Sequence, residues 1–126
     1  MVLIMNKSLI LLTLFIVTFS SAHAGEADVV NVEVRKRGSN LYDFSVTVQH
    51  QDSGWDHYAN RWEVLDEKGG IIGTRTLHHP HVKEQPFTRV LSGVVIPIGV
   101  KTVTIRAHDS VHKYGGKHIE MSLPLN

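Results

Sequence analysis

The sequence predicts an all-β domain, a seven-strand antiparallel sandwich, that follows an N-terminal export signal. Three observations support this prediction. Short segments in which apolar and polar residues alternate recur throughout residues 25–126. Glycine, proline, asparagine and aspartate, the residues typical of turns, separate these segments. Nowhere in the same region do apolar residues repeat with the 3.6-residue period of a helix.

The first 24 residues have the three parts of a secretory signal peptide. Lys7 supplies the positive charge, residues 9–19 form the apolar run, and Ala22-His23-Ala24 is a cleavage motif of small residues. The run is about 11 residues long, whereas a bilayer-spanning helix needs about 20. We therefore expect cleavage after Ala24, with an uncleaved anchor as the alternative, and a division into a signal peptide (1–24) and a single sandwich domain (25–126). Met5 is a second possible start.

The first two predicted strands carry the clearest alternation. The first, 29–37, is expected to turn one face inward and ends at a turn formed by residues 38–40. The second, 41–50, alternates apolar and polar residues along its whole length. The residues expected to face the core are Val30, Val32 and Val34 in the first strand and Tyr42, Phe44, Val46 and Val48 in the second.

Five further strands are predicted at 58–65, 71–77, 87–96, 100–107 and 118–123. The segment 78–86 is left as a loop, because its two prolines cannot donate to a sheet ladder. The count and spacing are typical of an immunoglobulin-like or fibronectin-III-like sandwich. Trp62 falls on the third strand, where such folds bury a tryptophan, and is expected in the core.

Charge and cysteine content exclude several classes of partner. Once Lys7 leaves with the signal peptide, the remaining lysines and arginines balance the 12 acidic residues. Such a domain lacks the basic excess that nucleic-acid binding or attraction to an anionic membrane requires, and no membrane insertion is expected after cleavage. No cysteine is present. The sequence therefore predicts neither a disulfide nor a lipid-modified cysteine, and any metal ligands must be nitrogen or oxygen atoms.

The histidines gather on alternate connections. In an antiparallel sandwich, successive connections alternate between its two ends, so the loops after the second, fourth and sixth strands should share one end. Every histidine beyond the predicted signal peptide lies in or beside these three loops: His50, His57, His78, His79, His81, His108, His112 and His118. We therefore predict a histidine-rich pole on loops held by a rigid scaffold, where binding sites are common.

Imidazole and carboxylate groups at this pole favour a divalent metal site. Neutral imidazole binds zinc and copper(II), and a carboxylate can complete the ligand set or orient a histidine. His79 and His81 are two residues apart, so an extended backbone directs them to the same side. The candidate ligands are His50, His57, His79, His81, His108, His112, Asp56 and Asp109. His78 has the opposite parity to His79, and His118 begins the last strand, so neither is expected to bind.

Other interpretations of the same pole remain open. It could form a non-metal interaction module of the cell envelope that binds a protein or small ligand, or a polar network that only fixes the loops. Ser53 and Ser110 each lie near a histidine and an aspartate, but neither has the surrounding Gly-x-Ser-x-Gly motif. We predict no catalytic or cofactor-binding residue, and an enzyme is the less favoured interpretation. The expected partners are zinc or copper(II), or an envelope protein, in the periplasm or outside the cell.

Three motifs resemble a known group of proteins. They are GWDHYA at 54–59, HPH with EQPFTR at 79–81 and 84–89, and HDSVH with YGG at 108–112 and 114–116. Together they are similar to those of a family of small, secreted, single-domain bacterial proteins of unassigned function. The resemblance covers nearly all of residues 25–126. It implies a signal peptide and a small β domain, and it implies no activity, substrate or site.

Overall fold

The computed structural model describes residues 25–125, so the predicted signal peptide at 1–24 lies outside the described residues. The described chain is all-β and has seven strands, which confirms the predicted fold class. Each strand begins and ends within two residues of its predicted bounds. The strands are β1 (Asp28–Gly38), β2 (Leu41–Gln49), β3 (Ala59–Leu65), β4 (Ile71–Thr76), β5 (Phe87–Val95), β6 (Thr102–Asp109) and β7 (Ile119–Ser122).

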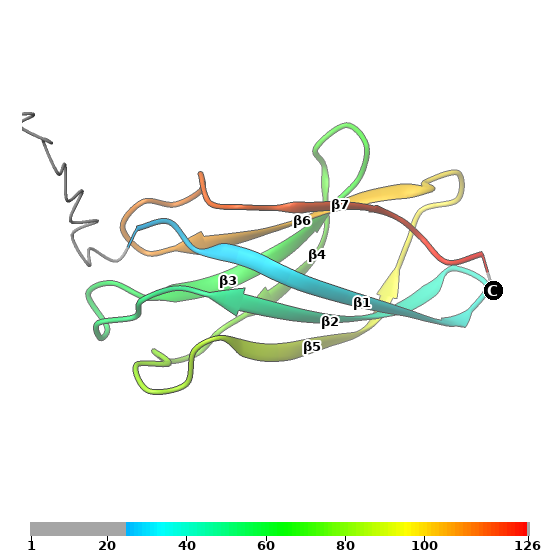
Figure 1. The fold of residues 1–126 in the computed structure, drawn as a ribbon. Coiled ribbons are helices and arrows are strands. Elements are labelled where there is room, and N and C mark those ends of the chain that lie inside the picture. The colour runs from blue at the N-terminus through cyan, green and yellow to red at the C-terminus, as the bar shows by residue number, and fades with distance from the viewer. Residues whose placement is uncertain (1–24, 126) are drawn as a thin grey trace, which may run out of the picture.

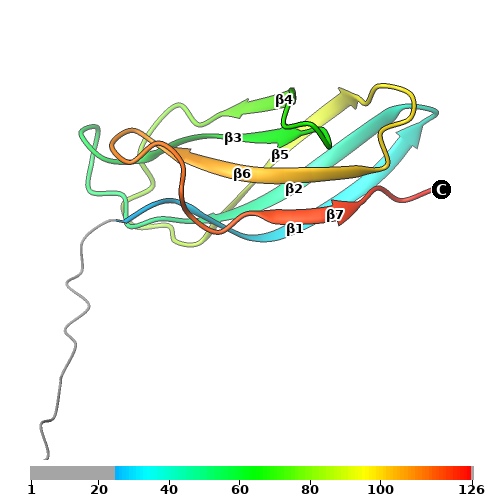
Figure 2. The ribbon, with the colours of Figure 1, turned by 90° about the horizontal axis from the view of Figure 1, so that it is seen from above.

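The strands form two sheets that face each other as layers (Figure 2). One sheet has the order β1-β2-β5 and the other β4-β3-β6-β7, and every pairing is antiparallel. The fourth strand therefore joins the sheet of the third strand, whereas the immunoglobulin constant type places it with the first two. The predicted sandwich is confirmed, with three strands packed on four.

The core lies between the inner faces of the two sheets. Trp62 of β3, Phe44 of β2, Phe87 of β5 and Ile105 of β6 are its largest fully buried side chains. Trp62 is in the position that the sequence predicts. The alternation within β2 is regular. Its odd-numbered positions from Leu41 onward are partly or fully exposed, whereas its even-numbered positions are buried.

The start of β1 differs from the prediction. Val30 was expected to face the core, but it is 42% exposed, and Val29 is buried in its place. The pairing with β2 shifts register between Val29 and Asn31, which is a β-bulge. At the bulge, the Val29 amide donates to the Lys117 carbonyl at 2.8 Å, and Val29 is already paired with β2. Val32 and Val34, beyond the bulge, pack against the core as predicted.

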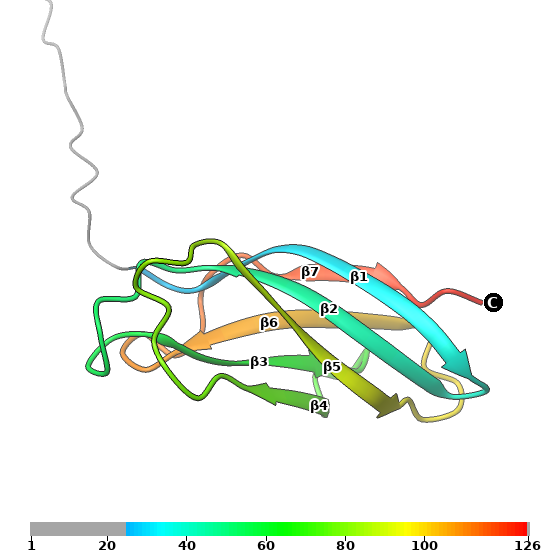
Figure 3. The same cartoon turned by 90° about the horizontal axis from the view of Figure 1, so that it is seen from below.

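Three loops and the start of the described chain lie at one end of the sandwich (Figures 1 and 3). The loops are residues 50–58, 77–86 and 110–118, and we call this end the histidine pole. The turns after β1 and β5 and the C-terminal end of the chain are at the opposite end (Figure 1). Between residues 25 and 125 there is no helix long and apolar enough to cross a membrane.

Candidate functional site at the histidine pole

His50, directly after β2, is a buried imidazole with a partner on each ring nitrogen. Its Nδ1 lies 2.5 Å from Oδ1 of Asp52, and its Nε2 lies 2.8 Å from the carbonyl oxygen of Gly25. Both partners accept hydrogen bonds, so both nitrogens donate and the ring is an imidazolium. Burial alone would lower the pKa of His50, but the hydrogen bond to Asp52 and its charge outweigh burial and raise the pKa.

Asp52 joins three segments of the chain through its buried carboxylate. Besides His50, Oδ1 accepts from the Ala59 amide at 2.9 Å, and Oδ2 accepts from the His81 amide at 2.8 Å. The first loop, the start of β3 and the second loop are thereby fixed to one side chain. Burial would raise the pKa of Asp52, but the hydrogen bonds from His50, His81 and Ala59 outweigh burial and lower the pKa.

Asp109, the last residue of β6, is a second buried carboxylate. Its Oδ2 lies 2.9 Å from Nε2 of His57 and 3.2 Å from Nδ1 of His112, and it also accepts from the amides of Val111 and His112. Its Oδ1 is buried without a hydrogen-bond partner. Burial would raise the pKa of Asp109, but the hydrogen bonds from the His112 and Val111 amides and from His57 outweigh it and lower the pKa.

These groups form a row of three imidazoles beside two carboxylates. The ring centroids of His50 and His57 are 4.8 Å apart, and those of His57 and His112 are also 4.8 Å apart. His50, His57 and Asp109 offer ligand atoms within 4.8 Å of one another, and no other group of three such residues between residues 25 and 125 does so. The two buried carboxylates of this cluster favour a cation beside them.

His79 and His81 lie outside this cluster. The His81 ring stacks on Phe87 with centroids 4.0 Å apart, and its Nε2 accepts from Arg89 at 3.0 Å. Burial and the charge of Arg89 lower the pKa of His81. The exposed His79 ring is 4.6 Å from that of His81, so the two rings are neighbours. The guanidinium beside them opposes the binding of a second cation.

His108 and Asp56 are also apart from the cluster. His108 is a buried residue of β6, where Nδ1 is 2.6 Å from Oδ1 of Asn60 and the ring meets the edge of Tyr114. Burial and the charge of Arg61 lower the pKa of His108. The carboxylate of Asp56 is exposed. His78 and His118, which were expected not to bind, are exposed and outside the cluster.

The two partners of His50, the Asp52 carboxylate and the Gly25 carbonyl, are not among the predicted site residues. Asp52 follows His50 by two residues, a spacing at which an aspartate often turns the chain and reaches neighbouring groups. That two-residue spacing is the feature of the sequence that could have identified Asp52 as a partner of His50. Nothing in the sequence marks a glycine carbonyl 25 residues away as the partner of His50 Nε2.

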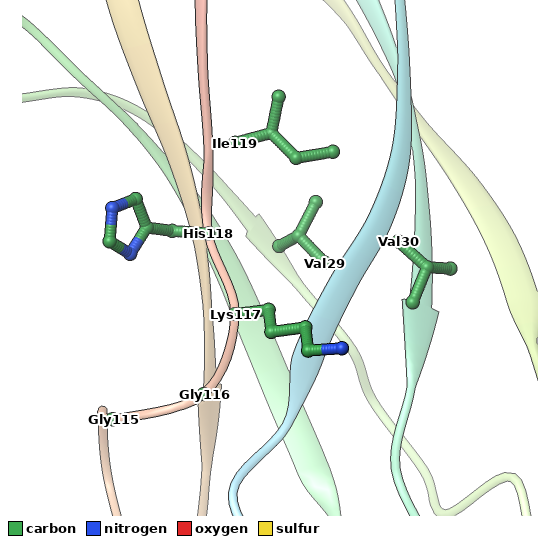
Figure 4. Close-up of a pocket in the computed structure, with 7 residues that line it drawn as sticks. All are labelled: Val29, Val30, Gly115, Gly116, Lys117, His118 and Ile119. Carbon is green, nitrogen blue, oxygen red and sulfur yellow. The ribbon is translucent and has the colours of Figure 1, made fainter.

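Another cavity lies away from the histidine cluster. It measures about 700 Å³ and follows the seam between β1 and the chain leading into β7 (Figure 4). Its lining residues are Val29, Val30, Gly115, Gly116, Lys117, His118 and Ile119. Figure 4 shows His118 directed to the opposite side of the chain from Ile119 and Lys117. This cavity contains no carboxylate and one imidazole, so it offers no ligand set for a metal.

The chain is 41% identical over 92 residues to a protein of Halomicrobium mukohataei described as "Putative lipoprotein". The matched region is 73% of this chain and 45% of that protein, so the chain spans less than half the length of the curated relative it matches. No protein-family model matches the chain, and no solved structure matches it.

Proposed function

We propose that this protein is exported to the cell envelope or beyond and binds a divalent transition metal, zinc or copper(II), at its histidine pole. The observation that carries the proposal is the convergence of ligand atoms from His50, His57 and Asp109 within 4.8 Å. His50 and His57 belong to the loop between β2 and β3, and Asp109 ends β6, 52 residues after His57. His112 Nδ1 lies 3.2 Å from the same Asp109 oxygen but outside this group of three, so it becomes the fourth ligand only after its side chain moves.

Ligand chemistry and spacing support this choice of metal. Zinc–ligand bonds of about 2.0–2.2 Å require the ligand atoms of a tetrahedral site to be roughly 3.3–3.6 Å apart. His57 Nε2 and Asp109 Oδ2 are 2.9 Å apart, so a small opening of the pair would admit the ion. His50 must lose a proton and release one acceptor, and its bond to the Gly25 carbonyl is the one nearer the surface. The absence of cysteine favours zinc or copper(II) over copper(I).

Export and envelope association rest on two supports. The first is the signal-peptide pattern of residues 1–24. The second is the relative, whose description as a lipoprotein is that of an envelope protein. A metal-binding protein in that compartment would sequester the ion, deliver it or limit its toxicity.

The test uses Trp55 as a reporter. Trp55 is 67% exposed and only two residues from His57, whereas Trp62 is fully buried in the core. Copper(II) quenches nearby tryptophan emission, so we expect saturable quenching by copper(II), and saturable zinc binding by isothermal titration calorimetry. Replacing His57 and His112 together by alanine should abolish both signals.

The matched control is the double variant His78→Ala and His118→Ala. It too removes two imidazoles, but both are exposed and lie outside the cluster. We expect it to bind metal as the unaltered protein does. Equal loss of binding in both double variants, or no binding by the unaltered protein, would contradict the proposal.

A second candidate function is an interaction module of the cell envelope. Each loop of the histidine pole presents one exposed large apolar side chain: Trp55, Val82 and Val111. Exposed apolar groups on neighbouring loops are typical of protein contacts. A partner captured through this surface should remain bound when a chelator is added, whereas a metal-bridged complex should dissociate. Trp55→Ser would weaken the first kind of complex and leave metal binding intact.

A further inference from the structure

The start of the described chain is fixed to the body of the sandwich. Ala27 and Val29 are buried, the Val29 amide donates to the Lys117 carbonyl at 2.8 Å, and the Lys117 amide donates to the Asp28 carboxylate at 2.7 Å. Gly116 packs so closely that a Cβ atom there would lie 1.9 Å from the Ala27 carbonyl oxygen. Gly25 is thus only two residues from an anchored position.

Gly25 lies directly beside the histidine cluster. Its carbonyl oxygen accepts from His50 Nε2 at 2.8 Å. Covalent geometry keeps the nitrogen of a residue within about 4 Å of its own carbonyl oxygen, so the Gly25 nitrogen is within about 7 Å of His50 Nε2. A cavity of about 470 Å³ opens at this point, and Gly25, Glu26, His50 and Gln51 are among its lining residues. This cavity leaves room beside His50 for the Gly25 nitrogen, and His50 is the member of the cluster that lines it.

We propose that cleavage between Ala24 and Gly25 creates a metal ligand, the α-amine of Gly25, which together with the Gly25 carbonyl chelates the ion at the histidine pole. This inference rests on the proposed metal-binding function. In the cleavage step, signal peptidase adds one water molecule across the peptide bond. Ala24 leaves with a new carboxylate, and Gly25 keeps a new amine.

The chemistry of the nitrogen explains why cleavage matters. In the uncleaved chain the nitrogen lone pair of Gly25 is delocalised into the Ala24 carbonyl, so the nitrogen is a poor ligand. In the cleaved chain the amine gives up a proton and offers a free lone pair. The amine nitrogen and the carbonyl oxygen of one residue close a five-membered ring around a metal. Cleavage thereby strengthens metal binding, so the processed protein loads the ion more tightly than the uncleaved chain does.

A one-residue shift of the amine tests the inference. The full chain is expressed and exported in two forms, the natural sequence and one with a single serine inserted between Ala24 and Gly25. Both keep the Ala22-His23-Ala24 motif, and mass spectrometry identifies the first residue of each product. We expect the form beginning at Gly25 to bind copper(II) roughly 10- to 100-fold more tightly than the form with the inserted serine. Chemical acetylation of the Gly25 amine should weaken binding to the same extent.

The outcomes separate this inference from the proposed function. Equal affinity in the natural, inserted and acetylated forms would overturn the inference and leave the proposed metal binding intact. No binding in any form would overturn the proposed function. A first residue other than Gly25 in the natural product would also overturn the inference. Melting temperatures measured with a chelator present should be equal for the three forms. A lower melting temperature in one form would show that its weaker binding comes from a loss of folding.

Discussion

Two buried histidines at the same pole are held in opposite charge states. His50 donates to a carboxylate and a carbonyl, and its pKa is raised. His81 accepts from Arg89, and its pKa is lowered. Burial acts on both rings in the same direction, so the difference comes from the hydrogen-bond partners. Partners from distant segments are the feature of this site that a linear sequence does not reveal.

The neutral state of His81 predicts a loss of stability in acid. A histidine whose pKa is lowered by folding contributes stability that is present above its unfolded pKa of about 6.5 and is lost as the pH falls below it. Replacing His81 with phenylalanine keeps a ring against Phe87 and removes the titrating group. The fall in melting temperature between about pH 6.5 and pH 5 should therefore be smaller in His81→Phe. Parallel curves for the two proteins would contradict this expectation.

The buried pair of His50 and Asp52 predicts a large effect of charge removal. In Asp52→Asn the imidazolium loses its counter-charge, and the His81 amide faces a donor or a weaker acceptor. We expect the free energy of unfolding to fall by about 3–5 kcal/mol, measured by urea denaturation at pH 7. Asp56→Asn is the control, because it makes the same change at an exposed position of the same loop. Its effect should remain within about 0.5 kcal/mol.

Among the elements, the strands could be predicted from the sequence and the start of β1 could not. Where one face of a strand is exposed to solvent, as in β2, the alternation of apolar and polar residues identifies the face that points into the core. At Val29 and Val30 two apolar residues adjoin, so alternation does not say which is inward. In the structure the Val29 amide donates to the carbonyl of Lys117, nearly 90 residues away, a contact that alternation alone does not predict.

The loops that meet at the pole were likewise predictable, because the connections of an antiparallel sandwich alternate between its ends. The side chains that converge there were not. His79 and His81 have the spacing of a ligand pair, but Phe87 and Arg89 of β5 hold His81 away from the cluster. His108 is near the third loop in sequence, yet it belongs to β6 and hydrogen-bonds to Asn60.

The close packing of Gly116 on β1 gives a prediction about the seam between β1 and β7. Alanine at this position would bring its Cβ 1.9 Å from the Ala27 carbonyl oxygen, so the start of β1 must move. We expect a destabilisation of about 1–3 kcal/mol or more, the usual cost of overpacking, measured by thermal unfolding. The control is Gly38→Ala, whose Cβ would meet Leu41 at 3.5 Å, an ordinary contact. Similar losses in the two variants would show that the close approach is relieved without cost.

On the scale of the whole molecule, the metal proposal predicts a coupling between binding and folding. The ligands come from the loop after β2 and from the end of β6, and they converge only in the folded state, so an ion that binds them stabilises the whole sandwich. At a free zinc concentration 100 times the dissociation constant, the stabilisation is about 2.7 kcal/mol. The melting temperature should rise with zinc and return to its initial value when the zinc is chelated. An unchanged melting temperature at saturating zinc would contradict binding to the native state.

The separation of the chain's C-terminal end from the histidine pole has a practical consequence (Figure 1). A fusion partner or affinity tag joined before Gly25 would crowd the imidazole rings and, if it carried histidines, would compete for the same ions. A tether beyond Leu125 would leave the three loops facing bulk solution. Biosensor immobilisation, dye labelling and carrier fusion of this domain are therefore best made through its C-terminal end.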